Sequence, residues 1–205
     1  MQYMWLFVIL IGAYLIGSIS TAIIFGKCVK GEDIREKGSG NAGATNTLRN
    51  FGKVAAIIVT FGDCLKAVLA IVFAILIANA THMDMGKIPL YVAGVGAVIG
   101  HNFPIYFKFK GGKGILVSMV AILFANWAIG LIVIVISVGI IAITRYVSLG
   151  SVLGSIAFVV LACVLKWGDF SYIIFSMVLA GLAIFMHRAN IKRLINGTES
   201  KLGSH

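Results

Sequence analysis

The chain has little charge for its length. Only 12% of its 205 residues are Asp, Glu, Lys or Arg, and 60% are hydrophobic. Soluble domains carry about 25% charged residues, so this composition and its long uncharged runs exclude a water-soluble globular fold. The sequence predicts an all-α integral membrane protein in which residues 1–205 form a single membrane-embedded domain.

Acidic residues and metal-binding patterns are also scarce. Seven acidic residues stand against 17 basic ones, for a net charge of +10. In a membrane protein, the tendency of basic residues to stay on the cytoplasmic side explains this excess without a nucleic acid. The three cysteines lie far apart, and no His-Glu-x-x-His zinc motif or Gly-x-Ser-x-Gly nucleophile elbow occurs. We therefore expect no metal, no cofactor and no nucleic-acid partner.

Apolar runs predict membrane spans at about residues 3–25, 54–78, 88–99, 149–165 and 170–186. The uncharged run from Ile115 to Ile143 is either one long tilted helix or two spans broken near Asn126-Trp127. With a break, only Lys87 and Lys166 fall on the outer side, whereas without it the basic residues divide ten to six. The charge distribution therefore favours seven transmembrane helices, with the N-terminus outside and the C-terminus cytoplasmic. A short amphipathic helix is expected in the tail after residue 187.

Two opposite charges, Asp63 and Lys66, lie inside the second predicted span. Each would cost roughly 2.5–3.5 kcal/mol at the centre of a bilayer, so both should face the interior of the bundle. Their i, i+3 spacing lets them pair on one helix face. The pair is either a structural ion pair or a part of the functional site.

The stretch from Gly100 to Gly114, named here the glycine–lysine loop, combines three lysines with four glycines. Glycines permit a positive φ and a close backbone approach, and an apolar helix is expected to begin at about Ile115. Positive charge and free N–H groups at a helix start make an anion site, most naturally for phosphate. The alternative is a basic cytoplasmic loop whose glycines only turn the chain.

A second polar cluster runs from Gly38 to Arg49, inside a loop expected over residues 27–53. This segment, named here the first-motif loop, offers hydroxyl and amide groups without bulk and ends in an arginine. Such a set suits a phosphate or a polyol, although a flexible solvated loop would also contain Gly, Ser and Asn. Two asparagines, Asn41 and Asn46, and the arginine favour a functional role.

Four segments together resemble the motifs of the bacterial acyl-phosphate-dependent glycerol-3-phosphate acyltransferases (the PlsY type): Gly38–Arg49, Gly100–Gly114, Arg145–Ser148 and His187–Gly197. The resemblance spans nearly the whole chain. It implies a multi-pass enzyme of the bacterial inner membrane with its active site on the cytoplasmic side. The implied reaction transfers an acyl group from acyl phosphate to the 1-hydroxyl of sn-glycerol 3-phosphate, the first step of phospholipid synthesis. Its products are lysophosphatidic acid and phosphate, and acyl-CoA and acyl carrier protein are not expected donors.

The resemblance also implies roles for single residues. Lys108, Gly111, Gly112 and Lys113 are candidates for the phosphate of glycerol 3-phosphate. The implied catalytic residues are Ser39, Asn41, Arg49, Lys113, Ser148, His187 and Asn190. The implied substrate-binding residues are Gly40, Thr45, Asn46, His101, Lys108, Gly111, Gly112 and Gly114. The expected partners are the two substrates and membrane lipids, with no obligate protein partner.

The chemistry leaves alternatives open. Neither His101 nor His187 has an acidic residue at the spacing of a His-x4-Asp dyad, so a phosphate oxygen of the substrate is expected to take the hydroxyl proton. His187 is the competing general base. An organophosphate transporter would call for inverted repeats, and no internal repeat is visible. A non-catalytic lipid-binding module would not need phosphate-binding loops on three separate connections.

Overall fold

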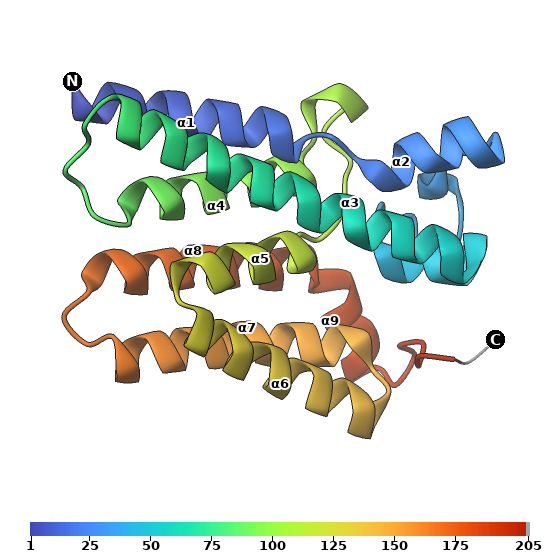
Figure 1. Cartoon of the computed structure of the whole chain (residues 1–205). Coiled ribbons are helices and arrows are strands. Elements are labelled where there is room, and N and C mark those ends of the chain that lie inside the picture. The colour runs from blue at the N-terminus through green and yellow to red at the C-terminus, as the bar shows by residue number, and fades with distance from the viewer. Residues whose placement is uncertain (204–205) are drawn as a thin grey trace. The chain divides into compact units, whose positions relative to one another are not determined.

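A computed structural model describes residues 1–203, and that part of the chain is helical and contains no strand. The chain forms two compact units, residues 1–121 and residue 122 onward. Their helices are labelled in Figure 1. The all-α membrane class predicted from composition is confirmed.

The first unit is built on three long helices. Its elements are α1 (Gln2–Gly17), α2 (Thr21–Phe25), the π-helix η1 (Gly26–Lys30), the 3-10 helices η2 (Ile34–Glu36) and η3 (Ile105–Phe107), α3 (Ala44–Ala80) and α4 (Ile88–Asn102). Helices α1, α3 and α4 pack against one another. Small residues bring α1 and α4 close together, because a Cβ at Gly17 would collide with the backbone of Ala97 and one at Gly100 with the backbone of Tyr14.

Two boundaries in this unit differ from the sequence-based expectation. The predicted first span is interrupted between α1 and α2, where Ser20 is extended (φ −100°, ψ 99°). The predicted loop over residues 27–53 is shorter, since α3 already begins at Ala44. Gly52 kinks α3 with a φ of 85°, and the turns that precede it are polar, so the sequence pattern does not distinguish them from a loop.

The second unit contains α6 (Trp127–Thr144), α7 (Val147–Leu165), α8 (Phe170–Met186) and α9 (Arg188–Ile195), and α5 (Ile115–Ala125) crosses the boundary between the units. Helix α7 packs against both α6 and α8. Two edge-on aromatic contacts of Phe158 support the α7–α8 interface, with ring centroids 5.8 Å from Tyr172 and 6.0 Å from Phe175.

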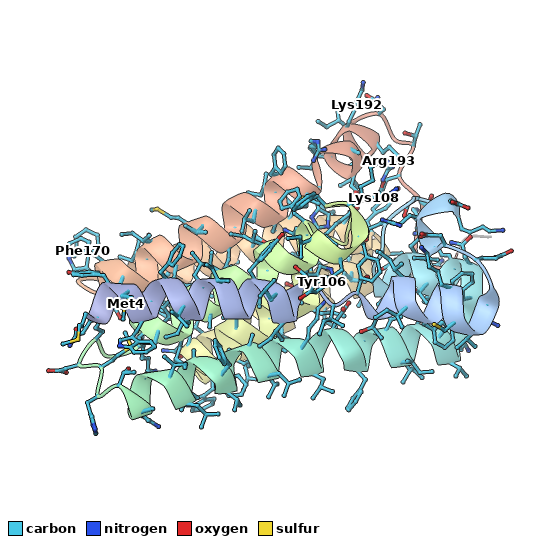
Figure 2. All side chains as sticks on the ribbon, turned by 90° about the horizontal axis from the view of Figure 1, so that it is seen from above. Met4, Tyr106, Lys108, Phe170, Lys192 and Arg193 are labelled. Carbon is cyan, nitrogen blue, oxygen red and sulfur yellow. The ribbon has the colours of Figure 1, made fainter. Side chains whose placement is uncertain are left out.

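The predicted break near Asn126 is confirmed. Asn126 is extended (φ −157°) and its Oδ1 accepts a hydrogen bond from the backbone N–H of Ile129, which caps α6. The predicted amphipathic helix is also present as α9, which bends by 61° from α8. Lys192 and Arg193 lie on α9, at the end of α8 opposite Phe170 (Figure 2).

Within residues 1–203, five helical segments are long and apolar enough to cross a membrane, or six if the bent pair of α8 and α9 counts as one span. Helix α5 is apolar but shorter. Large apolar side chains such as Phe7, Phe61 and Val135 are exposed on the long helices, as expected where lipid replaces water as the neighbour. The seven-span topology stays a prediction.

Candidate functional site

The first-motif loop is held together by the buried side chain of Asn46, in the first turn of α3. Its Nδ2 donates to the carbonyl oxygens of Ile34, Lys37 and Asn41 at 3.2, 3.0 and 3.0 Å. Its Oδ1 accepts from the backbone N–H of Ser39 at 3.1 Å. These bonds use the amide within the loop, so Asn46 shapes the loop from within. Ser39 itself is exposed.

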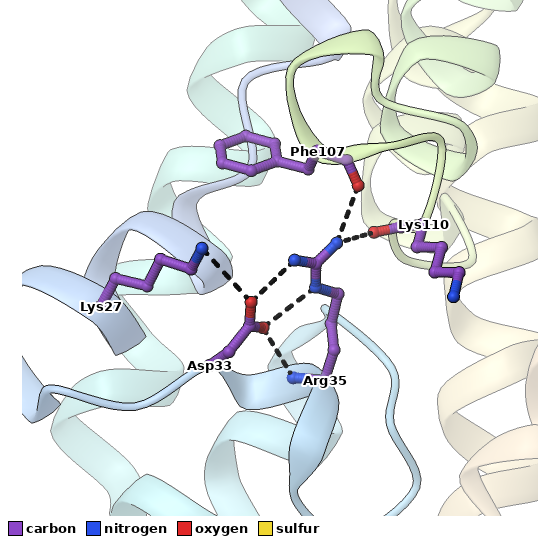
Figure 3. Close-up of polar contacts among 5 residues, drawn as sticks. All are labelled: Lys27, Asp33, Arg35, Phe107 and Lys110. Atoms are coloured by element: carbon purple, nitrogen blue, oxygen red, sulfur yellow. Dashed lines mark hydrogen bonds and ion pairs between the residues drawn. The ribbon is translucent and has the colours of Figure 1, made fainter.

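Arg35 connects the first-motif loop to the glycine–lysine loop (Figure 3). Its Nη1 donates to the carbonyl oxygens of Phe107 and Lys110 at 2.8 and 3.3 Å. Its Nε and Nη2 donate to the two carboxylate oxygens of Asp33 at 3.0 and 2.7 Å, and Lys27 Nζ lies 3.5 Å from Asp33 Oδ2. This set is named the Arg35 clamp. It fixes the orientation of one loop relative to the other through backbone atoms.

The clamp changes the ionisation of its carboxylate. Hydrogen bonds from Arg35, opposed by partial burial, lower the pKa of Asp33 from 3.8 to about 2. The same contacts raise the pKa of Arg35. Both groups are therefore charged at neutral pH, and the fork of the guanidinium stays available to the two carbonyl oxygens.

The backbone of the glycine–lysine loop folds back on the end of α4. The N–H groups of Gly111 and Gly112 donate to the carbonyl oxygens of Asn102 and His101 at 3.2 and 3.0 Å. These two glycine N–H groups are thus engaged by backbone acceptors. The first N–H groups of α5, which have no intrahelical acceptor, are the ones available to bind an anion.

Close packing explains the glycines. A Cβ at Gly112 would collide with the ring of His101 at Nε2, and one at Gly114 would come within 2.7 Å of Asn102 Oδ1. Gly114 also has a φ of 76°. Asn102 is buried, and its side-chain amide has no hydrogen-bond partner within the described chain. Lys108, the first lysine of the loop, has a φ of 58° and is exposed.

A buried group of ionisable side chains lies beneath the loop, and the predicted pairing of Asp63 with Lys66 is confirmed. Lys66 Nζ is 3.0 Å from Asp63 Oδ1 and 2.8 Å from His101 Nδ1, and all three side chains are buried. Asp63 and Lys66 come from α3, and His101 comes from the last turn of α4. The pair is therefore in contact with a residue of the loop motif.

In the second unit, three side chains donate hydrogen bonds to the carboxylate of Glu199. Ser148 Oγ and Asn190 Nδ2 each donate to Glu199 Oε1 at 2.6 Å, and Arg193 Nε donates to Oε2 at 2.6 Å. Burial acts to raise the pKa of Glu199, but the hydrogen bonds from Ser148, Asn190 and Arg193 outweigh it and lower the pKa. Glu199 thus orients the start of α7 and the middle of α9 as a charged group.

His187 lies at the junction of α8 and α9 and is buried. Its Nδ1 is 2.8 Å from the carbonyl oxygen of Ala183. A carbonyl can only accept, so the proton of a neutral ring lies on Nδ1 and the lone pair lies on Nε2. This tautomer is the one a general base acting through Nε2 needs.

Comparison with known proteins decides the family. A family model described as "Glycerol-3-phosphate acyltransferase" matches residues 7–197. The glycerol-3-phosphate acyltransferase of Thermoanaerobacter sp. (strain X514) is 48% identical over 191 residues, which cover 93% of this chain and 92% of the relative. The chain belongs to the glycerol-3-phosphate acyltransferase family. A relative of the same description from Clostridioides difficile (strain 630) is 42% identical over 196 residues, covering 96% of this chain and 95% of the relative.

Two solved structures share the fold. The chain is similar to PlsY (YgiH), an integral membrane glycerol 3-phosphate acyltransferase, in its glycerol 3-phosphate form, with a TM-score of 0.85 and 33% identity over 97% of this chain and 96% of that one. A lysophosphatidic acid form of PlsY matches with a TM-score of 0.81 and 32% identity, over 97% and 95% of the two chains. The resemblance to the PlsY type is confirmed. The protein is therefore classed as an acyltransferase, and the alternatives of a transporter and a lipid-binding module are set aside.

The residues predicted for the glycerol-3-phosphate acyltransferase site are distributed over both units. Ser148, His187 and Asn190 belong to the second unit and are buried. The exposed ones are Ser39, Gly40, Arg49 and Lys108; the partly buried ones are Asn41, Thr45, Gly111 and Lys113; and the buried ones of the first unit are Asn46, His101, Gly112 and Gly114.

Sequence reasoning missed Asp33 and Arg35, because nothing near them in the chain marks a contact with carbonyl groups more than 70 residues away. It also assigned no role to Glu199. The one available signal was the rarity of acids itself, since an isolated carboxylate in a basic segment needs partners.

Proposed function

We propose that this acyltransferase uses acyl phosphate as its donor and transfers the acyl group to the 1-hydroxyl of sn-glycerol 3-phosphate. The observation that carries the proposal is the clamped glycine–lysine loop ahead of α5, in a chain similar to a PlsY crystallised in a glycerol 3-phosphate form. The products are lysophosphatidic acid and inorganic phosphate. The enzyme acts at the cytoplasmic face of the bacterial inner membrane.

The phosphate of glycerol 3-phosphate binds at the glycine–lysine loop. Lys108 and Lys113 supply positive charge, and the first N–H groups of α5 supply directed donors. Gly111, Gly112 and Gly114 keep the backbone in the shape that exposes those donors. Because glycerol 3-phosphate is an anion, its affinity depends mainly on these two lysines and on the N–H donors of α5.

The acyl phosphate and the reacting groups are held by Ser39, Asn41 and Arg49, on a loop whose shape depends on Asn46, with Gly40 and Thr45 as neighbours. An acyl phosphate is a mixed anhydride, so the enzyme mainly aligns two anions and offsets their repulsion. The hydroxyl oxygen attacks the acyl carbon, the bond from that carbon to the phosphate oxygen breaks, and inorganic phosphate leaves.

A phosphate oxygen of a substrate takes the hydroxyl proton in this mechanism. The observation that favours the alternative base is the tautomer of His187, whose Nε2 carries the lone pair. Ser148 and Asn190 act in the same reaction and are oriented by Glu199. Loss of turnover in His187→Gln with both substrates still bound would favour the histidine over the substrate phosphate.

The membrane topology belongs to the same proposal. The break at Asn126 supports seven spans, in which α5 and α6 cross separately, the N-terminus lies outside and the C-terminus is cytoplasmic. Helix α5 is too short for a full span by itself, which is tolerated where its ends are covered by protein.

Phosphate release by the purified protein in lipid tests the proposal. Palmitoyl phosphate and glycerol 3-phosphate are supplied together and each alone, and palmitoyl-CoA replaces the donor in a parallel reaction. We expect turnover only with palmitoyl phosphate and glycerol 3-phosphate together, and its loss in Lys113→Ala and Arg49→Ala. Lysophosphatidic acid made from palmitoyl-CoA but not from palmitoyl phosphate would show that the donor is wrong.

A further inference from the structure

Three ionisable side chains meet inside the first unit, beneath the glycine–lysine loop. Lys66 Nζ lies 3.0 Å from Asp63 Oδ1 and 2.8 Å from His101 Nδ1. The side chains of Asp63, Lys66 and His101 are 3%, 4% and 5% exposed, so solvent does not replace any of these contacts. Burying such charges in a span is costly, and apolar residues of similar size would fill the same space. A role beyond packing is therefore indicated.

The hydrogen-bond inventory of Lys66 determines the tautomer of His101. A lysine ammonium has three N–H donors and no acceptor. Lys66 has three acceptors, namely the carbonyl oxygen of Ile19 at 2.9 Å, Asp63 Oδ1 at 3.0 Å and His101 Nδ1 at 2.8 Å. Nδ1 must then accept, which leaves the proton of the neutral ring on Nε2.

The Nε2 end of the ring faces the glycine–lysine loop. A Cβ added to Gly112 would collide with Nε2, so this atom lies directly against the backbone at Gly112. The carbonyl oxygen of His101 also accepts a hydrogen bond from the N–H of Gly112 at 3.0 Å, which holds the loop next to the residue that carries the ring. The polar contacts of the ring within residues 1–203 are those of Nδ1 with Lys66 and Asp63. With its proton on Nε2, the ring therefore presents a donor to the loop proposed to bind phosphate.

We propose that Asp63 and Lys66 are positioning residues of the acyltransferase, which hold His101 as the Nε2–H tautomer so that it donates to the phosphate of glycerol 3-phosphate. The inference rests on the proposed phosphate site at the glycine–lysine loop. It explains how one hydrogen-bond donor of that site is already in the required tautomer before substrate binds. Neither Asp63 nor Lys66 touches the substrate.

The two charges have separate tasks. Asp63 neutralises Lys66 and keeps the ammonium in the span. Lys66 alone selects the tautomer, because a ring without it would turn its Nδ1–H toward Asp63 Oδ1, now 3.5 Å away. Removing Lys66 therefore reverses the tautomer and leaves a lone pair on Nε2, which repels a phosphate oxygen.

The tautomer is measured directly by 15N NMR of histidine-labelled protein in lipid nanodiscs, with the His101 signals assigned by their loss in His101→Gln. We expect a protonated Nε2 and an unprotonated Nδ1 in the wild-type protein, and the reverse in Lys66→Met. A wild-type ring protonated on Nδ1, or a spectrum unchanged by Lys66→Met, overturns the inference. Lys87→Met, a lysine in the turn before α4, is the control that leaves the spectrum unchanged.

Equilibrium binding of glycerol 3-phosphate, without any acyl donor, supplies the second readout. His101→Gln retains an N–H near the position of Nε2 and should keep most of the affinity, whereas His101→Asn carries its amide near Nδ1. We expect His101→Asn and Lys66→Met to weaken binding roughly tenfold to hundredfold, the range for a hydrogen bond to a charged group. Equal binding by His101→Asn and His101→Gln would overturn the assigned donor.

A double variant guards against misfolding. Lys66→Met alone leaves a buried carboxylate unpaired, whereas Asp63→Leu/Lys66→Met removes both charges and should keep the melting temperature of the wild-type protein. The double variant is expected to bind more tightly than Lys66→Met, because the carboxylate that draws the proton to Nδ1 is gone as well. Binding at the wild-type level by a folded Lys66→Met protein overturns the inference and leaves the proposed function intact. Failure of the wild-type protein itself to bind glycerol 3-phosphate overturns both.

Discussion

At the residue scale, one arginine joins the two motif loops. Exposed ion pairs contribute little to stability, but Arg35 is only partly exposed and binds Asp33 through two parallel hydrogen bonds. The carboxylate fixes the guanidinium, and the remaining donors reach two carbonyl oxygens of the other loop. A residue without a proposed substrate contact thus determines the position of the lysines that are proposed to bind substrate.

Replacement of Arg35 should weaken binding more than it slows chemistry. We expect Arg35→Ala to raise the KM for glycerol 3-phosphate about tenfold or more, because hydrogen bonds of a charged donor are lost. Arg35→Lys should lose nearly as much, since an ammonium cannot reproduce the planar fork. Steady-state kinetics measure both. Lys37→Ala removes an exposed pair with Glu32 and serves as the control, and an equal effect of this control would contradict the role of the clamp.

The depressed pKa of Asp33 predicts a pH dependence of stability. Since the folded-state pKa is about 2 against an ordinary 3.8, the ionised form stabilises the fold above about pH 4. This contribution is lost as the pH falls toward 2. The difference in melting temperature between wild-type protein and Asp33→Asn should be constant above pH 4 and shrink below it. Asp84→Asn, in an exposed turn, should show no such difference.

At the scale of elements, the glycine–lysine loop works as an extension of two helices. Its backbone bonds to the last turn of α4, and its end is the start of α5. Glycines are needed where the loop touches His101 and Asn102, so their spacing reflects packing as much as anion binding.

Substitution of a single glycine separates these effects. Gly112→Ala adds a Cβ that collides with the His101 ring, and we expect the KM for glycerol 3-phosphate to rise about tenfold through loss of a charged hydrogen bond, with a smaller change in kcat. Gly139→Ala in α6, where nothing lies within 4 Å of the added atom, should leave kinetics unchanged. A kcat loss without a KM change in Gly112→Ala would contradict a binding role for the loop.

The tail after α9 also connects two helices through hydrogen bonds. Glu199 accepts hydrogen bonds from α7 and α9, so Glu199→Gln should lower the melting temperature by roughly 3–12 °C, from hydrogen bonds of about 1.5–3 kcal/mol to a charged group. Glu36→Gln, at an exposed position of η2, is the matched control. Unchanged thermal unfolding of Glu199→Gln would show that Ser148 and Asn190 are oriented by other contacts.

Sequence patterns predicted the helices better than the breaks and boundaries between them. The apolar period and charge count gave the break at Asn126 and the helix after Met186, because capping residues and charges mark such ends locally. The interruption at Ser20 was missed, since one serine inside an apolar run is compatible with an unbroken helix. The start of α3 at Ala44 was missed because its first turns are polar and resemble a loop. Asp63 and Lys66 were paired correctly from their spacing, but their contact with His101 depends on tertiary packing between α3 and α4.

At the scale of the whole molecule, composition alone determined the class, and the family comparison determined the enzyme. The first and second motifs were recognisable because they are long and specific. Their positioning residues, Asp33, Arg35 and Glu199, act through backbone atoms or distant partners. A charge pattern cannot reveal such contacts.

The proposed topology predicts which side of the membrane each turn faces. Cys28 lies exposed in η1, on the side proposed to be cytoplasmic. In a protein carrying Cys64→Ala and Cys163→Ala, an impermeant maleimide should label Cys28 in inverted vesicles and not in intact cells. With Cys28 also replaced by alanine, a cysteine introduced by His82→Cys should show the reverse. Labelling of both positions from one side would contradict an odd number of spans between them.

The Arg35 clamp has a consequence for how sequences of this family can diverge. Because Arg35 recognises the backbone carbonyl oxygens at Phe107 and Lys110, the clamp itself does not constrain the side chains at those two positions. Phe107 is constrained separately, since its side chain packs against the apolar cluster around Ile34. Asp33 and Arg35, by contrast, depend on each other atom by atom, so a change at one is tolerated only with a compensating change at the other. Over evolutionary time Asp33 and Arg35 should be conserved together, whereas the exposed side chain at position 110 can vary.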